Sequence, residues 1–236
     1  MTHAAVLRLE PTSIVAEQAV LDCEVDVLGH WYGDTPELLD RAYGGFAEQT
    51  VFIVVRDGEQ RVVGFARLLR PGPNPLKTIV DLQDEPLSVD GPAAVAEAGI
   101  DLGCCWDIAT LGVRPELGSS GTLVAAALYH GMFSALRLNR VDWLLAIIDQ
   151  RVRKLLNMTG LLLHTLPGTA PALYMGSPAC APVYGHLPSM FERLQGRDPR
   201  TYDRITLGAG LSGVSLPPQD AFRLPVRGSA DPAGRR

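Results

Sequence analysis

Two long stretches without a formally charged residue constrain the fold of this chain most. The first runs from Leu117 to Leu136 and the second from Met158 to Phe191. Glycines, serines and a histidine make the first stretch too polar for a membrane span, and five prolines interrupt the second. We therefore expect no membrane-spanning segment. The first stretch is predicted to form a buried helix, and the second to line an interior or a pocket.

Composition excludes several classes of protein. The chain has 236 residues, of which 47% are hydrophobic and 20% charged, which predicts a well-buried globular core. A formal net charge of -5 and an aromatic content of 6% argue against nucleic acid as a partner. The four cysteines show no metal-ligand spacing and no secretory signal pattern opens the chain, so we expect reduced thiols, no metal site and a cytoplasmic location.

Local patterns predict an α+β fold with a mixed sheet. Helices are expected first, one capped by Ser13 and one beginning at Thr35-Pro36. The elements expected after them are a hairpin of residues 51–55 and 61–69, an extended segment over 76–82, a helix over 93–98, a strand over 104–113, a helix ending near 138, a strand over 143–148, a helix over 150–158, a strand over 161–165, a strand around 183 and a helix over 189–194. Residues 1–195 are expected to form one domain. Residues 196–236, rich in Pro and Gly, are expected to form an extension that is disordered at its end.

A strand, a Gly/Ser-rich turn and a helix follow one another at residues 104–138. Backbone N–H groups at the beginning of a helix can hold a phosphate, although a capped helix is the commoner explanation of such a turn. The candidate phosphate-binding residues are Gly118, Ser119, Ser120, Gly121 and Thr122.

The end of this strand, Leu111-Gly112-Val113-Arg114-Pro115, resembles the L-x-V-x-P segment of the GNAT superfamily of acyl-CoA-dependent acyltransferases. The pyrophosphate loop of that superfamily, Q/R-x-x-G-x-G/A, is matched only at Gly121, because Gly118 and Leu123 replace its first and last residues. The resemblance implies a GNAT-like fold, in which a mixed, mostly antiparallel central sheet is flanked by helices. It also implies that the backbone of Leu111, Gly112 and Val113 pairs with a pantetheine arm.

Two further segments are similar to the acyl-homoserine-lactone synthases and the long-chain N-acyl amino acid synthases within that superfamily. They are Val62-Val63-Gly64-Phe65-Ala66-Arg67-Leu68-Leu69, which matches V-V-G-x-x-R-L, and Trp106-Asp107-Ile108-Ala109-Thr110-Leu111, which resembles W-E-x-S-R. Ala109 and Thr110 stand where lactone synthases carry Ser and Arg, so lactone synthesis is not implied. Leu156 replaces the Tyr that serves as general acid in ordinary acetyltransferases.

The candidate catalytic residue is Asp107, as base or as anchor for a substrate ammonium. The alternative is a structural carboxylate held by Arg67 or by backbone donors. Arg67 is a candidate for binding an acceptor carboxylate, with a structural role as its alternative. The other candidate substrate-binding residues are Trp31, Trp106, Thr110 and Tyr174. The alternative for the two tryptophans is a place in the hydrophobic core.

The resemblance implies an N-acyltransferase that moves an acyl group from a pantetheine thioester to an amine, in signalling or secondary metabolism. The altered loop favours a donor on an acyl carrier protein, or an unusual acyl-CoA, and Arg114, Arg137 and Arg140 are candidates for contacting an acidic carrier. The alternatives are a catalytically silent GNAT-like regulatory module and a hydrolase that uses Cys180 or Ser177. The acyl group, the amine and the oligomeric state stay open.

Overall fold

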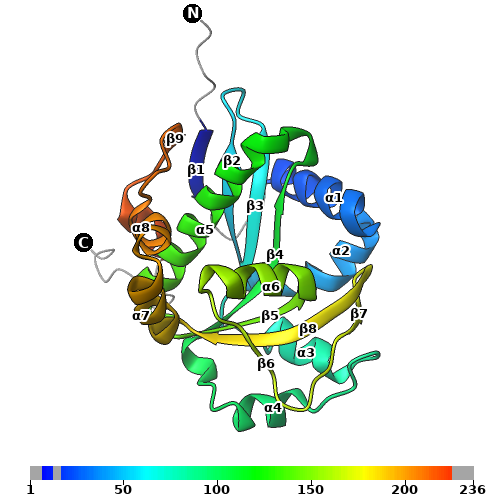
Figure 1. Ribbon diagram of the computed structural model, residues 1–236. Helices are drawn as coiled ribbons and strands as arrows, with labels where there is room; N and C mark the ends of the chain where they lie inside the picture. Colours follow the sequence, from blue (N-terminus) through cyan, green and yellow to red (C-terminus); the bar gives the residue numbers. More distant parts are fainter. Residues whose placement is uncertain (1–6, 13–16, 225–236) are drawn as a thin grey trace, which may run out of the picture.

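A nine-stranded mixed sheet forms the centre of the computed structural model, which describes residues 7–12 and 17–224 (Figure 1). The strands are β1 (Leu7–Thr12), β2 (Thr50–Arg56), β3 (Val62–Leu69), β4 (Cys105–Val113), β5 (Trp143–Asp149), β6 (His164–Thr165), β7 (Ala172–Tyr174), β8 (Ser177–His186) and β9 (Val214–Ser215). Their order is β6-β8-β5-β4-β3-β2-β1-β9, and β7 pairs with β8. Only the β4–β5 and β1–β9 pairs are parallel. The predicted mixed, mostly antiparallel sheet is therefore confirmed.

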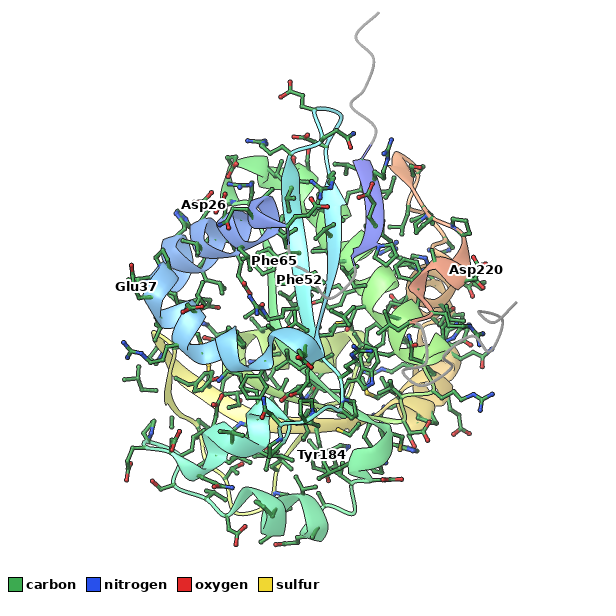
Figure 2. The ribbon with its side chains drawn as sticks, turned by 180° about the vertical axis from the view of Figure 1, so that it is seen from behind. Asp26, Glu37, Phe52, Phe65, Tyr184 and Asp220 are labelled. Carbon is green, nitrogen blue, oxygen red and sulfur yellow. The ribbon has the colours of Figure 1, made fainter. Side chains whose placement is uncertain are left out.

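Helices cover both faces of the sheet. They are α1 (Gln18–Tyr32), α2 (Pro36–Tyr43), α3 (Lys77–Gln83), α4 (Gly91–Glu97), α5 (Gly121–Leu138), α6 (Gln150–Thr159), α7 (Leu187–Arg197) and α8 (Pro199–Leu207). Side chains alternate along β2, so Phe52 packs with Phe65 under α1 and α2, while Val51 and Ile53 join the core around α5 (Figure 2). Because both faces are covered, every residue of β2 and β3 is buried.

Most of the predicted elements are present, and the reasons are local. Thr35 caps α2 by accepting a hydrogen bond from the backbone N–H of Leu38, with Pro36 in the first turn. The uncharged segment beginning at Leu117 forms most of α5, which lies against β1 to β4. The proposed cap Ser13 lies outside the described residues, and α1 begins at Gln18. No helix in the described part of the chain is long and apolar enough to cross a membrane.

The prediction of an extended segment over residues 76–82 is wrong. These residues lead into and form α3, in which Leu76, Ile79 and Leu82 are buried at helical spacing and Lys77 pairs with Asp81 one turn later. The prediction that two helices come before any strand is also incomplete, because β1 precedes α1 and pairs with β2.

The described part of the C-terminal segment packs onto the domain. The expected boundary at residue 195 falls within α7, and residues of α8 and of the segment after it belong to the same core cluster as α5. These residues are Ile205, Leu211 and Phe222. Strand β9 then pairs with β1 at the far edge of the sheet. Residues 225–236, which include the end predicted to be disordered, lie outside the described residues.

Candidate active site

The two parallel strands at the centre of the sheet separate partway along their length. Pairing joins only Cys105–Asp107 of β4 to Trp143–Leu145 of β5, although both strands continue. A bulge in β4 adds to this divergence, since Arg67 of β3 faces Thr110 and Leu68 faces Ile108, which leaves Ala109 as the extra residue. Beyond Asp107, β4 therefore presents an edge that is not paired with β5.

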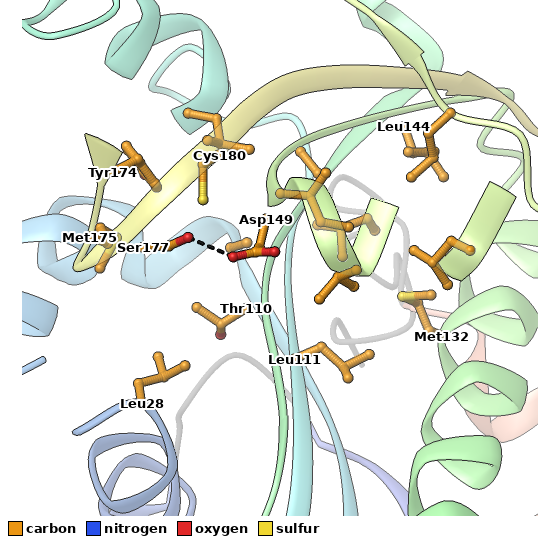
Figure 3. Close-up of a pocket in the computed structure, with 18 of the residues that line it drawn as sticks. Leu28, Thr110, Leu111, Met132, Leu144, Asp149, Tyr174, Met175, Ser177 and Cys180 are labelled. Carbon is orange, nitrogen blue, oxygen red and sulfur yellow. Dashed lines mark hydrogen bonds between the residues drawn. The ribbon is translucent and has the colours of Figure 1, made fainter. Parts of the chain in front are cut away.

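A cavity of about 200 Å³ lies in this split (Figure 3). Its walls come from β4, β5, α5, α6 and the uncharged segment of residues 158–191, and they are mostly apolar. The lining includes Leu28, Tyr32, Asp34, Thr110, Leu111, Met132, Leu144, Ala146, Asp149, Val152, Leu156, Tyr174, Met175, Ser177 and Cys180. The uncharged segment thus lines a pocket, as expected, and also completes the sheet through β8.

One end of the cavity carries a buried polar pair. Asp149 ends β5 and caps α6, where it accepts hydrogen bonds from the backbone N–H of Arg151 at 2.7 Å and from its guanidinium at 3.1 Å. Ser177 Oγ donates to Asp149 Oδ2 at 2.8 Å (Figure 3). The hydrogen bonds from Arg151, the largest influence, hold the pKa of Asp149 well below its usual range. Asp149 is therefore a fixed negative charge at neutral pH.

A second carboxylate, Asp34, enters the cavity from the connection between α1 and α2. It is 6% exposed, and its Oδ1 atom is buried without a hydrogen-bond partner among the residues that the structure describes. Burial, and then the charge of Glu24, raise the pKa of Asp34. An unpaired buried carboxylate oxygen costs free energy, and no donor among the described residues offsets this cost for Asp34.

Arg67 has its hydrogen bonds committed to another carboxylate. Its guanidinium donates from Nε to Glu24 Oε1 at 3.0 Å and from a terminal nitrogen to Glu24 Oε2, and it lies over the rings of Tyr43 and Phe52 at 4.5 and 4.6 Å. Thr110 Oγ1 also donates to Glu24, at 2.5 Å. This buried cluster agrees with a structural role for Arg67. The guanidinium charge lies beside the cavity wall and is neutralised by Glu24.

Asp107 lies behind the cavity rather than in its lining. Its two oxygens accept hydrogen bonds from the backbone N–H and the hydroxyl of Thr78, both at 2.6 Å, and not from Arg67. Burial raises the pKa of Asp107 to about 6. A small void separates Asp107 from Tyr174, whose hydroxyl donates to Asp81 at 2.5 Å while Lys77 bonds both oxygens of Asp81. Thr78 therefore holds Asp107 in place through its backbone N–H and its hydroxyl. None of these contacts tests the role of Asp107 as a base, which stays a prediction.

The remaining candidate residues fall into two groups. Thr110, Leu111 and Tyr174 line the cavity, whereas Trp31 is 61% exposed and Trp106 is buried in the core beside α5. Neither tryptophan is among the residues described as lining the cavity. Gly112 and Val113 complete β4, where they pair with Phe65 and Gly64.

The candidate phosphate-binding turn forms a 3₁₀ helix over Pro115–Ser120, followed directly by α5. Gly118 adopts φ +52°, a conformation that glycine favours, and Gly118, Ser119, Ser120 and Thr122 are exposed. The cation beside this turn, Arg114, donates to the carbonyl of Val62 and to Asp26 at 2.8 Å each. Glu116, within the turn, adds a negative charge. An anion at this turn would therefore meet backbone groups, because the Arg114 side chain is already hydrogen-bonded to Val62 and Asp26.

The sequence indicated the cavity segment and named Ser177 only as a possible hydrolase nucleophile, and it missed Asp149. Asp149 and Ser177 are 28 positions apart and meet only because β5 and β8 pair. The local signal of Asp149 is that of a helix cap, which conceals its position at the split. Cys180 lies in β8 rather than in a loop; burial raises its pKa, and no histidine is among the described lining residues. Neither a reactive thiol nor a Ser–His pair is formed there.

Neither a family profile nor a curated protein sequence matches this chain. Several solved structures have the same fold. FeeM, an N-acyl amino acid synthase from uncultured soil microbes, gives a TM-score of 0.58 at 14% identity, with 81% of this chain and 99% of FeeM covered. BjaI, a CoA-dependent acyl-homoserine lactone synthase solved with SAM and isopentyl-CoA, gives 0.52 at 18% identity, with 92% and 97% covered. The homoserine lactone synthase LasI gives 0.50 at 14% identity, with 78% and 90% covered. The expected fold, a mixed, mostly antiparallel sheet flanked by helices, is confirmed, and these three enzymes share it.

Proposed function

We propose that this chain is an amide-forming N-acyltransferase that moves an acyl group from a pantetheine thioester to an amine. The observation that carries the proposal is the unpaired edge of β4 above an apolar cavity, in a fold shared with acyl-transferring enzymes. An extended pantetheine arm contains amides that can add to an exposed strand edge. The apolar cavity below it suits the acyl chain.

The reaction needs positioning more than reactive side chains. The amine nitrogen bonds to the thioester carbonyl carbon, the C–S bond breaks, and the thiol leaves with one proton while a second proton passes from the former ammonium to solvent or a base. Backbone N–H groups on the open edge of β4 are suited to stabilise the oxyanion. Leu156, which stands where acetyltransferases carry the general-acid Tyr, lines the cavity and offers no proton.

For the donor, we propose an acyl carrier protein that docks on α6. One side of this helix lines the cavity through Val152 and Leu156, while other residues of α6, with Arg197 of α7, line a basic groove. The groove includes Arg151, Arg153, Lys154 and Arg197 and lies beside the exposed Leu155 and Met158. A basic groove on a chain of net charge -5 complements an acidic carrier surface.

This surface replaces part of the one expected from the sequence. Arg137 and Arg140 lie at or just beyond the C-terminal end of α5, an 18-residue helix about 27 Å long, so they are remote from the turn that begins it. Arg114 is paired with Asp26. The weak hold on a nucleotide at the turn also favours a carrier over free acyl-CoA.

The test compares donors and a charge-reversed surface. Thiol release and amide formation are measured with acyl-loaded carrier proteins and acyl-CoAs, using a broad mixture of amines. The variant Lys154→Glu/Arg197→Glu leaves untouched Arg151, whose guanidinium donates to Asp149, and Arg153, which donates to the carbonyl of Leu163. It should raise the KM for an acyl carrier at least tenfold without changing the KM for acyl-CoA. Charge reversal at the exposed Arg41 and Arg200 is the matched control.

Three outcomes contradict parts of the proposal. If the charge-reversed variant loses activity equally with acyl-CoA, the proposed carrier-docking surface is wrong, but the proposed transferase function stands. If only acyl-CoA serves as the donor, the proposed carrier protein is wrong. Absence of transfer from every donor would favour the catalytically silent module, for which the weak turn and Leu156 are the supporting observations.

A further inference from the structure

The connection between α1 and α2 holds Asp34 rigidly. Gly33 ends α1 in the left-handed conformation, with its N–H bonded to the carbonyl of Gly29 at 3.0 Å, and Thr35 caps α2 on the other side. Asp34 is thus fixed between two helix ends. Because the backbone at Asp34 is already fixed, ordering this residue on a ligand costs less conformational entropy.

The side chain of Asp34 lacks the partner that its burial requires. Its Oδ1 atom is buried and unpartnered, and the nearby Glu24 repels rather than stabilises its charge. The buried cations of this region are engaged elsewhere, since Arg67 is bonded to Glu24 and Lys77 to Asp81. A hydrogen-bond donor that enters the cavity would satisfy this oxygen.

The charge of the cavity lining indicates which kind of hydrogen-bond donor can bind to Asp34. Two carboxylates, Asp34 and Asp149, line it, and no Lys, Arg or His is among its described lining residues. Asp149 is already satisfied by Ser177 and Arg151. A cationic amine would be stabilised there, whereas a ligand that brings its own carboxylate would find no cation to neutralise it.

We propose that Asp34 binds the ammonium group of the acceptor, and that the acceptor is a primary amine without a carboxylate on the carbon that carries the nitrogen. This inference rests on the proposed transferase function and specifies its acceptor. Asp34 holds the nitrogen beside the open edge of β4, near Thr110. The acceptor's apolar part then contacts aromatic and aliphatic side chains such as Leu28 and Tyr32.

The experiment uses acceptor pairs that differ only in the carboxylate. They are phenethylamine and phenylalanine, 3-methylbutylamine and leucine, and 2-methylpropylamine and valine, and each is tested with the acyl donor that the intact chain uses best. For at least one pair, kcat/KM for the amine should exceed that for the amino acid at least tenfold. Equal use of the members of every pair, or preference for the amino acids, overturns the inference and leaves the transferase intact. Absence of transfer to all six refutes the proposed function as well.

The variant Asp34→Asn tests the role of the charge. It should raise the KM for the preferred amine at least tenfold and leave the KM for the donor unchanged. Because the wild-type carboxylate is buried and unpaired, the melting temperature of the variant should equal or exceed that of the wild type. A structural Asp34 would instead lower the melting temperature and leave the amine KM unchanged, which would overturn the inference. Glu37→Gln, an exposed carboxylate on α2, is the control.

Discussion

Removal of the Arg67 guanidinium distinguishes a structural ion pair from a substrate-binding residue. Arg67→Met keeps much of the aliphatic stem but removes the guanidinium that lies over Tyr43 and Phe52. It leaves Glu24, which is 1% exposed, with Thr110 as its hydrogen-bond donor. Breaking one side of a buried ion pair costs about 3–5 kcal/mol. For a chain of this size, that loss corresponds to a decrease of about 6–20 °C in Tm.

The assay is thermal and urea denaturation followed by circular dichroism, with two comparison variants. Arg56→Met removes another buried arginine, but its partners Glu10 and Glu17 have side chains that are 32% and 61% exposed, so water can replace the lost contact. We expect that variant to lose about 1 kcal/mol or less through its ion pairs. In Arg67→Met/Glu24→Met, both charges are gone, and most of the lost stability should return.

The structural interpretation of Arg67 fails on one particular combination of results. If Arg67→Met unfolds at nearly the wild-type temperature while the KM for a carboxylate-bearing acceptor rises, then Arg67 binds that carboxylate. That result would also contradict the proposal of a carboxylate-free acceptor. Unchanged acceptor KM below the unfolding transition, together with a large loss of stability, agrees with the structure.

Two further predictions concern Asp107 and the turn before β8. Because the folded-state pKa of Asp107 is raised to about 6 from 3.8, the folded protein binds this proton more tightly, and its contribution to stability falls as the pH rises from about 4 to 6. Asp107→Asn should therefore gain stability relative to the wild type over that interval, by up to about 3 kcal/mol, in denaturation measured from pH 4 to 7; a constant difference would contradict it. In Gly176→Ala, a Cβ would lie 2.1 Å from the carbonyl oxygen of Tyr32 at φ +70°, so we expect a loss of about 2 kcal/mol or more in Tm-derived stability. Gly99→Ala, at φ +68° with no atom within 4 Å, should lose less, and equal losses would show that backbone strain alone is responsible.

The amino-acid sequence predicts the fold well because its signals are local. The cap at Thr35, the hairpin turn at Asp57-Gly58 and the uncharged helix are each determined by neighbouring residues. Helix α3 was mistaken for an extended segment because only seven residues carry its pattern between two proline-containing stretches. Such a short apolar run does not distinguish a helix from a strand.

The site could be predicted only in part, because its contacts join distant segments. Thr110 and Tyr174 were singled out and do line the cavity. The partner of Asp107 is Thr78, 29 positions away, and that of Arg67 is Glu24, 43 positions away. Nothing in the local sequence separates these pairs from the Asp107–Arg67 pair considered first. The unpartnered state of Asp34 is likewise a property of the packed molecule alone.

The path of the chain relates the width of the cavity to the far edge of the sheet. Strands β1 to β4 lie on one side of the split and β5 to β8 on the other, with three residue pairs between them. The chain crosses this boundary after α5 and crosses back through α8, which packs on α5, before β9 joins β1. The chain therefore connects the two half-sheets twice, once after α5 and once through α8 to β9. No residue of α8 or β9 is among the described residues that line the cavity. Under the proposed function, substitutions in the C-terminal segment would change acyl-chain selectivity through the angle between the half-sheets.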